Sequence, residues 1–172
     1  MGSGDRLAHG GESVGRRGER PPPSDPEAGI YQGRRVARIY SSPSGLTILV
    51  GRTAEENDIL SLELARPRDV FFHVSGQPGS HVIVLVPESR PDLDRDTVSF
   101  AASLAAAWSS ARDAKQVSVH YAPCAAVSKR RGQPPGEVML RDWKSVRVAP
   151  DRQEAWRRQG DGAARAGDEG RP

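Results

Sequence analysis

The hydrophobic and polar positions along the chain predict a core of short strands accompanied by two helices. Short runs rich in Val, Ile, Leu, Phe and Tyr favour strands. These runs occupy residues 34–41, 46–50, 70–74, 80–86, 116–121, 138–140 and 145–148. In residues 54–65 and 97–110 the apolar positions recur at roughly helical spacing instead, so we expect a helix in each segment. Because strands outnumber helices and several are joined by short turns, the pattern predicts an α+β domain with a mostly antiparallel or mixed sheet.

Local signals mark the beginnings of both predicted helices. Thr53 and Glu56 fit a capping box, in which each side chain binds a backbone N–H group at the helix start. Asp94 and Asp96 precede the second helix, where the helix dipole favours acidic groups. The second helix is rich in alanine, the strongest helix former, and its small side chains would let it lie close against the sheet.

Residues 70–74 and 80–86 are expected to form a hairpin around the turn 76–79, whose sequence is Gly-Gln-Pro-Gly. Proline fixes φ and glycine permits positive φ, so these four residues can reverse the chain. Residues 82–86 are apolar on both faces, as in a strand that is covered on each side. Polar side chains flank the turn, so we expect a buried hairpin that presents a polar tip. They are Asp69, His73, Ser75, Ser80 and His81.

The hydrophobic fraction of 36% is low for a chain of 172 residues, and the deficit lies at the two ends. Residues 1–29 consist mainly of Gly, Arg, Glu, Pro and Ser, and residues 151–172 of Arg, Gly, Asp, Glu and Ala. Neither segment can bury enough apolar surface to offset the entropy lost on ordering. The composition therefore predicts one folded domain, residues 30–150, between a disordered N-terminal tail (1–29) and a disordered C-terminal tail (151–172).

The net charge of +3 is unevenly distributed, because residues 101–150 hold eight Lys or Arg against three Asp or Glu. Three of these cations, Lys129, Arg130 and Arg131, begin a Gly/Pro-rich loop at residues 129–136. Such a loop can approach phosphates, whose neutralisation releases counterions. A merely solvated charged loop remains the alternative. No stretch approaches the ~18 apolar residues of a membrane span, so we expect a cytoplasmic protein without a membrane partner.

Three histidines, His73, His81 and His120, raise the possibility of a metal site, since imidazole binds transition ions. With a four-residue turn 76–79, however, His73 and His81 fall on opposite faces of the sheet; only an odd loop length would bring them together. The single cysteine, Cys124, excludes an intrachain disulfide and a cysteine-based zinc site. No nucleophile elbow, Walker A loop or dinucleotide fingerprint is present. We therefore expect neither a cofactor nor an enzyme.

Three segments, residues 51–58, 69–73 and 78–82, resemble the NFACT-R domain, which is also catalogued as a domain of unknown function. The resemblance continues through 101–109, 129–138 and 145–150, in order and at compatible spacings. Phe71 stands where the family often has Trp, and Thr53 where it often has Asn. The positions that match the family are Arg52, Asn57, Asp58, Asp69, His73, Gly79, Ser80 and His81.

This resemblance implies a non-enzymatic RNA-binding module, similar to that of the large proteins that rescue obstructed ribosomal large subunits. Because it has no room for the family's other domains, we expect the chain to be one of the family's stand-alone NFACT-R proteins. What the resemblance implies is binding to tRNA or ribosomal RNA in ribosome-associated quality control or translation, with the large ribosomal subunit as a candidate partner. It leaves the oligomeric state open.

The candidate RNA-binding residues combine the resemblance with the basic positions. They are Arg52, His73, Ser80, His81, Lys129, Arg130, Arg131 and Lys144. Two other functions remain open at this point. One is a metal-dependent hydrolase of nucleic acids that uses His73, His81 and His120. The other is a protein-interaction adaptor that binds through its tails.

Overall fold

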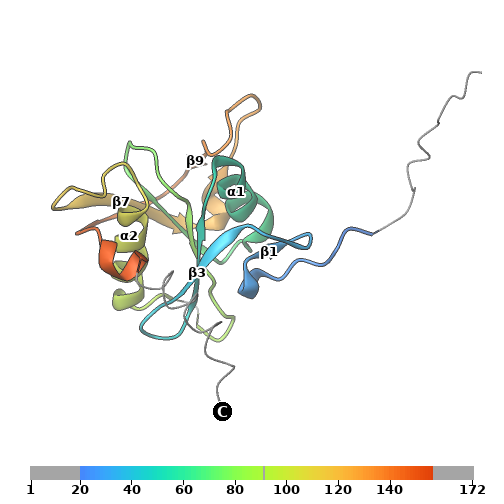
Figure 1. Ribbon diagram of the computed structural model, residues 1–172, viewed down its shortest axis with the longest axis horizontal. Helices are drawn as coiled ribbons and strands as arrows, with labels where there is room; N and C mark the ends of the chain where they lie inside the picture. The colour runs from blue at the N-terminus through green and yellow to red at the C-terminus, as the bar shows by residue number, and fades with distance from the viewer. Residues whose placement is uncertain (1–19, 91, 157–172) are drawn as a thin grey trace, which may run out of the picture.

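A six-stranded antiparallel sheet forms the centre of the computed structural model, which describes residues 20–90 and 92–156 (Figure 1). Every neighbouring pair of strands in this sheet runs antiparallel. The α+β class and the mostly antiparallel sheet predicted from the sequence are therefore confirmed. The strands follow the order β10 (Lys144–Val148), β7 (Val117–Pro123), β5 (Val70–Val74), β6 (Val82–Val84), β4 (Thr47–Gly51) and β3 (Ala37–Ser41).

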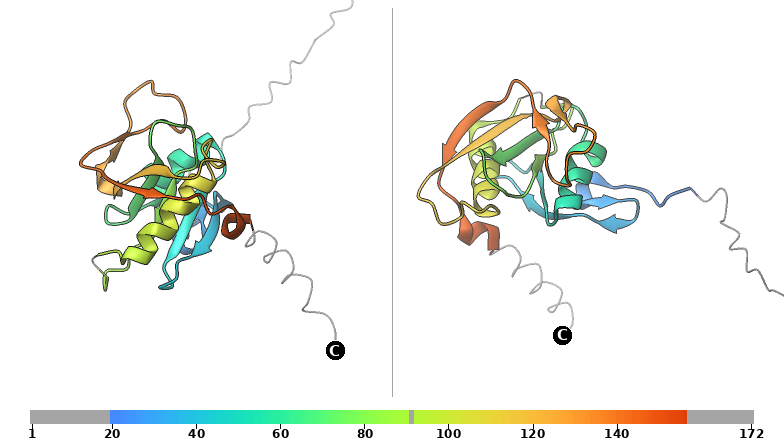
Figure 2. Two further views of the ribbon diagram at one scale, coloured as in Figure 1. Left: turned by 90° about the vertical axis from the view of Figure 1, so that its left-hand side faces the viewer. Right: turned by 90° about the horizontal axis from the view of Figure 1, so that it is seen from above.

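Helix α2 (Arg95–Ala107) covers one face of the sheet (Figure 2) and confirms the helix predicted at residues 97–110. It begins where Asp94 accepts a hydrogen bond from the Thr97 N–H (3.0 Å), so the expected acidic start is an N-cap. Its small side chains allow close approach to the sheet. The main apolar cluster lies between α2 and the sheet. It includes Ile48, Phe72, Val82, Ala101, Ala102, Leu104, Ala105, Ala106 and Val119.

A second helical segment packs on the opposite face of the sheet. Helix α1 (Ala54–Asp58) continues into the π-helical turn η2 (Ile59–Leu64), which confirms the predicted helix at 54–65. Thr53 caps α1 as expected, accepting from the Glu56 N–H, but the Glu56 carboxylate binds Arg52 instead of completing the capping box. The apolar side chains of this layer form a second cluster. It includes Leu49, Leu60, Leu64, Phe71 and Ile83.

Short elements flank these three layers, which are α2, the sheet, and α1 with η2. On one side lie the 3₁₀ turn η1 (Pro26–Ala28) and the pair β1 (Ile30–Tyr31) and β2 (Arg34–Arg35). The strand predicted at 34–41 is therefore interrupted at Val36, whose N–H donates to Gly29 (2.9 Å). On the other side, η3 (Cys124–Ala126) separates β7 from β8 (Val127–Ser128), which pairs with β9 (Met139–Leu140). Residues 127 and 128 thus form a separate ribbon with β9 and do not extend β7.

The folded unit reaches beyond the predicted boundaries at residues 30 and 150. Asp25 caps η1, and its backbone pairs with Ile30. After Pro150 the chain returns to the sheet, where Ala155 is fully buried and its carbonyl accepts a hydrogen bond from the Tyr40 hydroxyl (2.7 Å). The rest of the two predicted tails, residues 1–19 and 157–172, lies outside the described residues. In the described part, no helix is long and apolar enough to cross a membrane.

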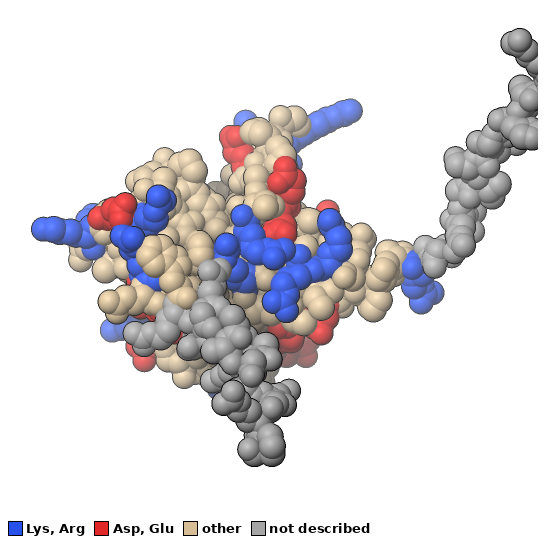
Figure 3. Space-filling view, viewed as in Figure 1, with Lys and Arg blue, Asp and Glu red and all other residues tan. Residues whose placement is uncertain are grey.

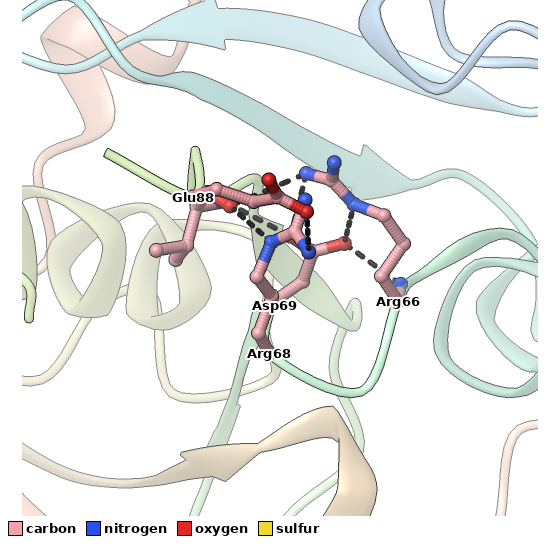
Figure 4. A network of polar contacts seen from close by, with 5 residues as sticks. Arg66, Arg68, Asp69 and Glu88 are labelled. Carbon is pink, nitrogen blue, oxygen red and sulfur yellow. Dashed lines mark hydrogen bonds and ion pairs between the residues drawn. The ribbon is translucent and has the colours of Figure 1, made fainter. Parts of the chain in front are cut away.

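The buried carboxylate of Asp69 joins the start of β5 to the segment after β6 (Figure 4). It accepts hydrogen bonds from the backbone N–H groups of Arg66 (2.7 Å) and Val86 (2.9 Å), and from the Arg66 guanidinium (3.1 and 3.3 Å). Arg68 adds bonds to the Val86 carbonyl (2.9 Å) and to Glu88 (3.2 Å). A buried charge paired in this way would be costly to leave alone, so Asp69 holds the fold together.

Candidate nucleic-acid interface

Strand register brings the three candidate histidines into one row across the sheet. Phe72 pairs with Val82, so His73 lies opposite His81, and the next strand pairs His73 directly with His120. The His73 and His81 rings meet edge to face with centroids 5.5 Å apart. The prediction that these two histidines lie on opposite faces is therefore wrong. The connection between Phe72 and Val82 has nine residues, an odd number, whereas the predicted pairing assumed a four-residue turn.

Docking of the turn against the end of α2 sets this register. Gly79 forms a bridge with Ser109, and the Ser80 N–H donates to the Trp108 carbonyl (2.9 Å). A Cβ atom on Gly79 would lie 2.8 Å from the Ser109 Cβ, so this approach requires glycine. Because Gly79 and Ser80 pair with the end of α2, they do not join the ladder of hydrogen bonds between β5 and β6. β6 accordingly begins at Val82, later than the predicted start at residue 80.

A cavity of about 960 Å³ lies beside this turn. Its walls include the start of α1, the central strands, the turn itself, the end of α2 with the residues that follow it, and residues 134–138 at the end of the basic loop. The loop runs beside α1 and projects from the molecule (Figure 1). His120 lines the cavity together with half of the residues predicted to bind RNA. Those residues are Arg52, His73, Ser80 and His81.

His81 is buried, with 1% of its surface exposed, and both of its ring nitrogens are hydrogen-bonded. Nε2 faces the carbonyl of Gly136 (3.0 Å), and Nδ1 lies 3.0 Å from both the Ser61 hydroxyl and the Asn57 carbonyl. The Ser61 hydroxyl donates to the same Asn57 carbonyl (2.9 Å), so these groups form one buried network around the ring. Burial, helped by the neighbouring His73, lowers the pKa of His81 to about 4 and keeps the ring neutral. The geometry therefore favours a structural role for His81, which connects η2 to the basic loop, over direct contact with RNA.

Asn57 supports His81 from α1. Its Oδ1 accepts the His81 backbone N–H (3.0 Å), and its Nδ2 donates to the Gly79 carbonyl (3.5 Å). Gly51 makes room for this side chain, because a Cβ atom there would overlap the Asn57 Oδ1. Asn57 therefore connects α1 to the hairpin turn and serves the fold.

The three cations of the basic loop have different surroundings. The Lys129 ammonium donates to the carbonyls of Pro134 (2.7 Å) and Glu137 (2.8 Å) and pairs with Asp58 (3.0 Å). All three of its protons are thus used to close the loop onto α1. Arg130 and Arg131 are exposed, and their side chains have no partner among the described residues. Of the three loop cations, all within the described part of the chain, Arg130 and Arg131 are thus the two free to meet a phosphate.

The two remaining predicted cations lie on different faces. Arg52 forms a bidentate pair with Glu56 (2.7 and 2.9 Å) and donates to the Arg35 carbonyl (2.7 Å). Figure 3 shows Lys and Arg side chains gathered over β1 to β3, where Arg52 approaches Arg38, and at the tip of the projecting loop. Lys144 is exposed on β10 opposite Tyr121, so it faces away from the side that carries His120.

His73 and His120 are the accessible members of the histidine row, each partly exposed. Burial lowers the pKa of His73, although hydrogen bonds with the backbone of Val74 and Gly79 partly oppose this, and burial also lowers the pKa of His120. Both rings are therefore neutral at pH 7, with one donor and one acceptor nitrogen each. His120 stacks on Trp143, with ring centroids 3.7 Å apart and planes 13° from parallel.

The layer of α1 and η2 leaves part of its sheet face open. The apolar cluster under this layer includes Leu49, Ile83 and Phe71 from β4, β6 and β5, but no described residue of β7 or β10. Beyond them, the same face of β7 and β10 carries polar side chains, all exposed or half-buried. They are Ser118, His120, Ser145 and Arg147.

The histidine row does not assemble the ligands of a metal ion. Among residues 20–90 and 92–156, no group of three or more His, Cys, Asp or Glu side chains is placed to hold one. His81 is the central obstacle, because both of its nitrogens already bind Ser61 and Gly136. The described residues therefore give the hydrolase alternative no ligand set.

Comparison with known proteins identifies the family of this chain. A model described as the NFACT protein RNA binding domain matches residues 36–142, more than half of the chain. The chain belongs to the NFACT RNA-binding domain family. It is 38% identical over 116 residues to the Rqc2 homolog RqcH of Bacillus subtilis, covering 67% of this chain and 20% of that protein. To RqcH of Streptococcus suis it is 31% identical over 121 residues, 70% of this chain and 21% of the relative.

A more distant relative and a solved structure extend the comparison. The Ribosome quality control complex subunit NEMF homolog of Drosophila melanogaster is 30% identical over 82 residues, 48% of this chain and 8% of that protein. The structure of the C-terminal of the fibronectin/fibrinogen-binding protein from Streptococcus suis matches with a TM-score of 0.66 and 31% identity, covering 72% of this chain and 49% of that one. The chain thus spans about a fifth of the RqcH proteins.

Within this NFACT RNA-binding domain, Trp143 is the candidate residue that sequence reasoning missed. It follows directly after the family match, which ends at residue 142. One sequence signal was available: Trp143 stands between Asp142 and Lys144, without an apolar neighbour that would indicate a core position. Its contact with His120 depends on strand pairing between distant segments, which a single sequence does not display.

Proposed function

We propose that this chain is a non-enzymatic RNA-binding module that acts on tRNA or ribosomal RNA in cytoplasmic ribosome quality control. The family match supports RNA binding, and the names of the RqcH and NEMF relatives support the ribosomal setting. The observation that carries the proposal is the cavity beside the hairpin turn, where four predicted RNA-binding residues from three separate segments meet beside the basic loop. The large ribosomal subunit is the partner we expect.

In this proposal the residues divide into RNA ligands and supports. Arg130 and Arg131 contact phosphates, because their guanidinium groups are exposed and unpaired within the described residues. His73 and His120 offer neutral donor and acceptor nitrogens to bases or riboses. His81 and Lys129 hold the loop in position.

The test is a salt titration of binding between the full chain and labelled RNA, using a tRNA and a fragment of large-subunit ribosomal RNA. Replacing Arg130 and Arg131 together by Ala should weaken binding and reduce the slope of log K against log salt by about one unit per lost contact. Arg95→Ala is the matched control, since Arg95 is an exposed cation at the start of α2. An unchanged slope in the double variant, or no binding of either RNA by the wild type, would overturn the proposal.

A further inference from the structure

Trp143 has an exposure that the fold does not require. It is 48% exposed and takes part in neither apolar cluster. The other large apolar side chains exposed in the described part of the chain are Ile39 and Trp156, and the Arg152 guanidinium lies over the Trp156 ring at 4.7 Å. Trp143 rests with one face on His120, while no cation or second ring among the described residues contacts its other face.

The backbone holds Trp143 in this position. Asp142 has φ of 49°, in the left-handed region that few residues other than glycine adopt and that Asp tolerates. The turn leads directly into β10, where Ser145 pairs with His120. The indole is thus held between a tight turn and a strand anchored to the sheet. A rigid aromatic side chain loses little conformational entropy on binding, which makes it an efficient contact surface.

The surroundings of the stack suit a nucleotide. His120 lines the cavity, so the stack stands at the border of the proposed RNA site. On the same face of β10, Ser145 and the exposed Arg147 follow, with Ser145 bonded to Ser118 (2.8 Å). An aromatic platform flanked by a cation and hydroxyl groups offers separate partners for the base, the phosphate and the ribose.

We propose that the free face of Trp143 stacks on an unpaired base, so that the RNA recognised by this chain contains a single-stranded segment such as a loop, a bulge or an overhang. In a paired A-form helix the faces of the bases are covered by their neighbours, whereas unpaired bases can turn out and stack on aromatic rings. The inference rests on the proposed RNA-binding function and specifies its substrate class. His120 backs the indole, and Arg147 meets the adjacent phosphate.

The experiment compares a short single-stranded RNA with the blunt duplex formed from it and its complement, at one salt concentration. The full-length wild type should prefer the single strand. Trp143→Leu should lower single-strand affinity by about tenfold, or ~1.4 kcal/mol, and leave duplex affinity unchanged, since only the single strand can stack a base on the indole. Trp143→Phe, which keeps an aromatic face, should retain most of the affinity. Ile39→Ala, which removes another exposed apolar side chain, is the control.

A second readout uses the unaltered protein, so that the inference does not depend on a folded variant. Stacking of a base on Trp143 should quench tryptophan fluorescence more with the single strand than with the duplex. Equal affinity of the wild type for both RNAs, or equal losses on both in Trp143→Leu, would overturn the single-strand inference and leave general RNA binding intact. A wild type that binds neither RNA would overturn both.

Discussion

At the scale of single residues, His81 connects three parts of the chain, because its side chain and backbone bind groups of α1, η2 and the basic loop. Replacing His81 by Ala leaves the Gly136 carbonyl and the Ser61 hydroxyl without this partner. We expect the free energy of unfolding to fall by about 1–3 kcal/mol, the usual cost of leaving buried polar groups unpaired. Urea denaturation measures it. An unchanged stability combined with lost RNA binding would instead make His81 an RNA ligand.

The low pKa of His81 also makes stability depend on pH. The folded protein keeps His81 neutral down to about pH 4, whereas the unfolded chain binds a proton near pH 6.5. This contribution is therefore complete above pH 6.5 and is lost as the pH falls toward 4, by roughly 3 kcal/mol in all. Burial of His73 and His120 acts in the same direction. Urea unfolding from pH 7.5 to 4.5 should show a steeper loss in the wild type than in His81→Gln.

Gly51 and Asn57 form a pair whose coupling can be measured. Gly51→Ala places a methyl group against the Asn57 Oδ1 and displaces the bond to the His81 N–H. We expect a loss of about 1–3 kcal/mol from overpacking, or more if the Asn57 bonds also break. In an Asn57→Ala background the same substitution should cost much less, because the obstructing oxygen is gone. Additive losses in this double-mutant cycle would contradict the proposed steric cause.

At the scale of elements, the basic loop separates support from binding. Lys129 closes the loop through Pro134, Glu137 and Asp58, while Arg130 and Arg131 extend into solvent. Lys129→Ala should therefore lower the melting temperature, with the salt dependence of RNA binding nearly unchanged. Arg130→Ala should instead leave the melting temperature nearly unchanged and reduce the salt slope of RNA binding by about one unit. Equal effects of the two substitutions on both measurements would show that the loop cations act as one group.

At the scale of the whole molecule, the described chain contains the proposed RNA site, and the ends add little charge. Residues 1–19 hold three Lys or Arg and three Asp or Glu, and residues 157–172 hold four and three. Segments so close to neutral attract a polyanion weakly at physiological salt, where the Debye length is ~8 Å. The folded part should therefore bind RNA nearly as well as the full chain.

The corresponding experiment compares residues 20–156 with the full chain in a salt titration against one structured RNA. Ending at residue 156 instead of 150 keeps the buried Ala155 and its bond to Tyr40. Circular dichroism checks that the shortened chain is folded. A folded 20–156 chain that loses more than about tenfold in affinity, or ~1.4 kcal/mol, would transfer the RNA site to the ends and favour the adaptor hypothesis.

The amino-acid sequence by itself determined the elements whose signals are local. The Asp94 cap and the alanine-rich segment after it specify α2, and Thr53 specifies the start of α1. The apolar run at β5 was predicted with its bounds, Val70–Val74. These features depend on residues within a few positions of one another, where capping, helix propensity and side-chain alternation act. The motifs that indicated the family are likewise short segments of neighbouring residues.

Only the tertiary structure decided how the candidate site is assembled. The row of His81, His73 and His120 depends on the parity of the hairpin register, and the contact of Gly79 with Ser109 sets that parity. The burial of His81, the closure of the loop by Lys129 and the stacking of Trp143 on His120 likewise join residues more than twenty positions apart. A shift of one residue in strand pairing reverses the face of every side chain. Local sequence cannot specify such a shift, because the contact that selects it lies on another element.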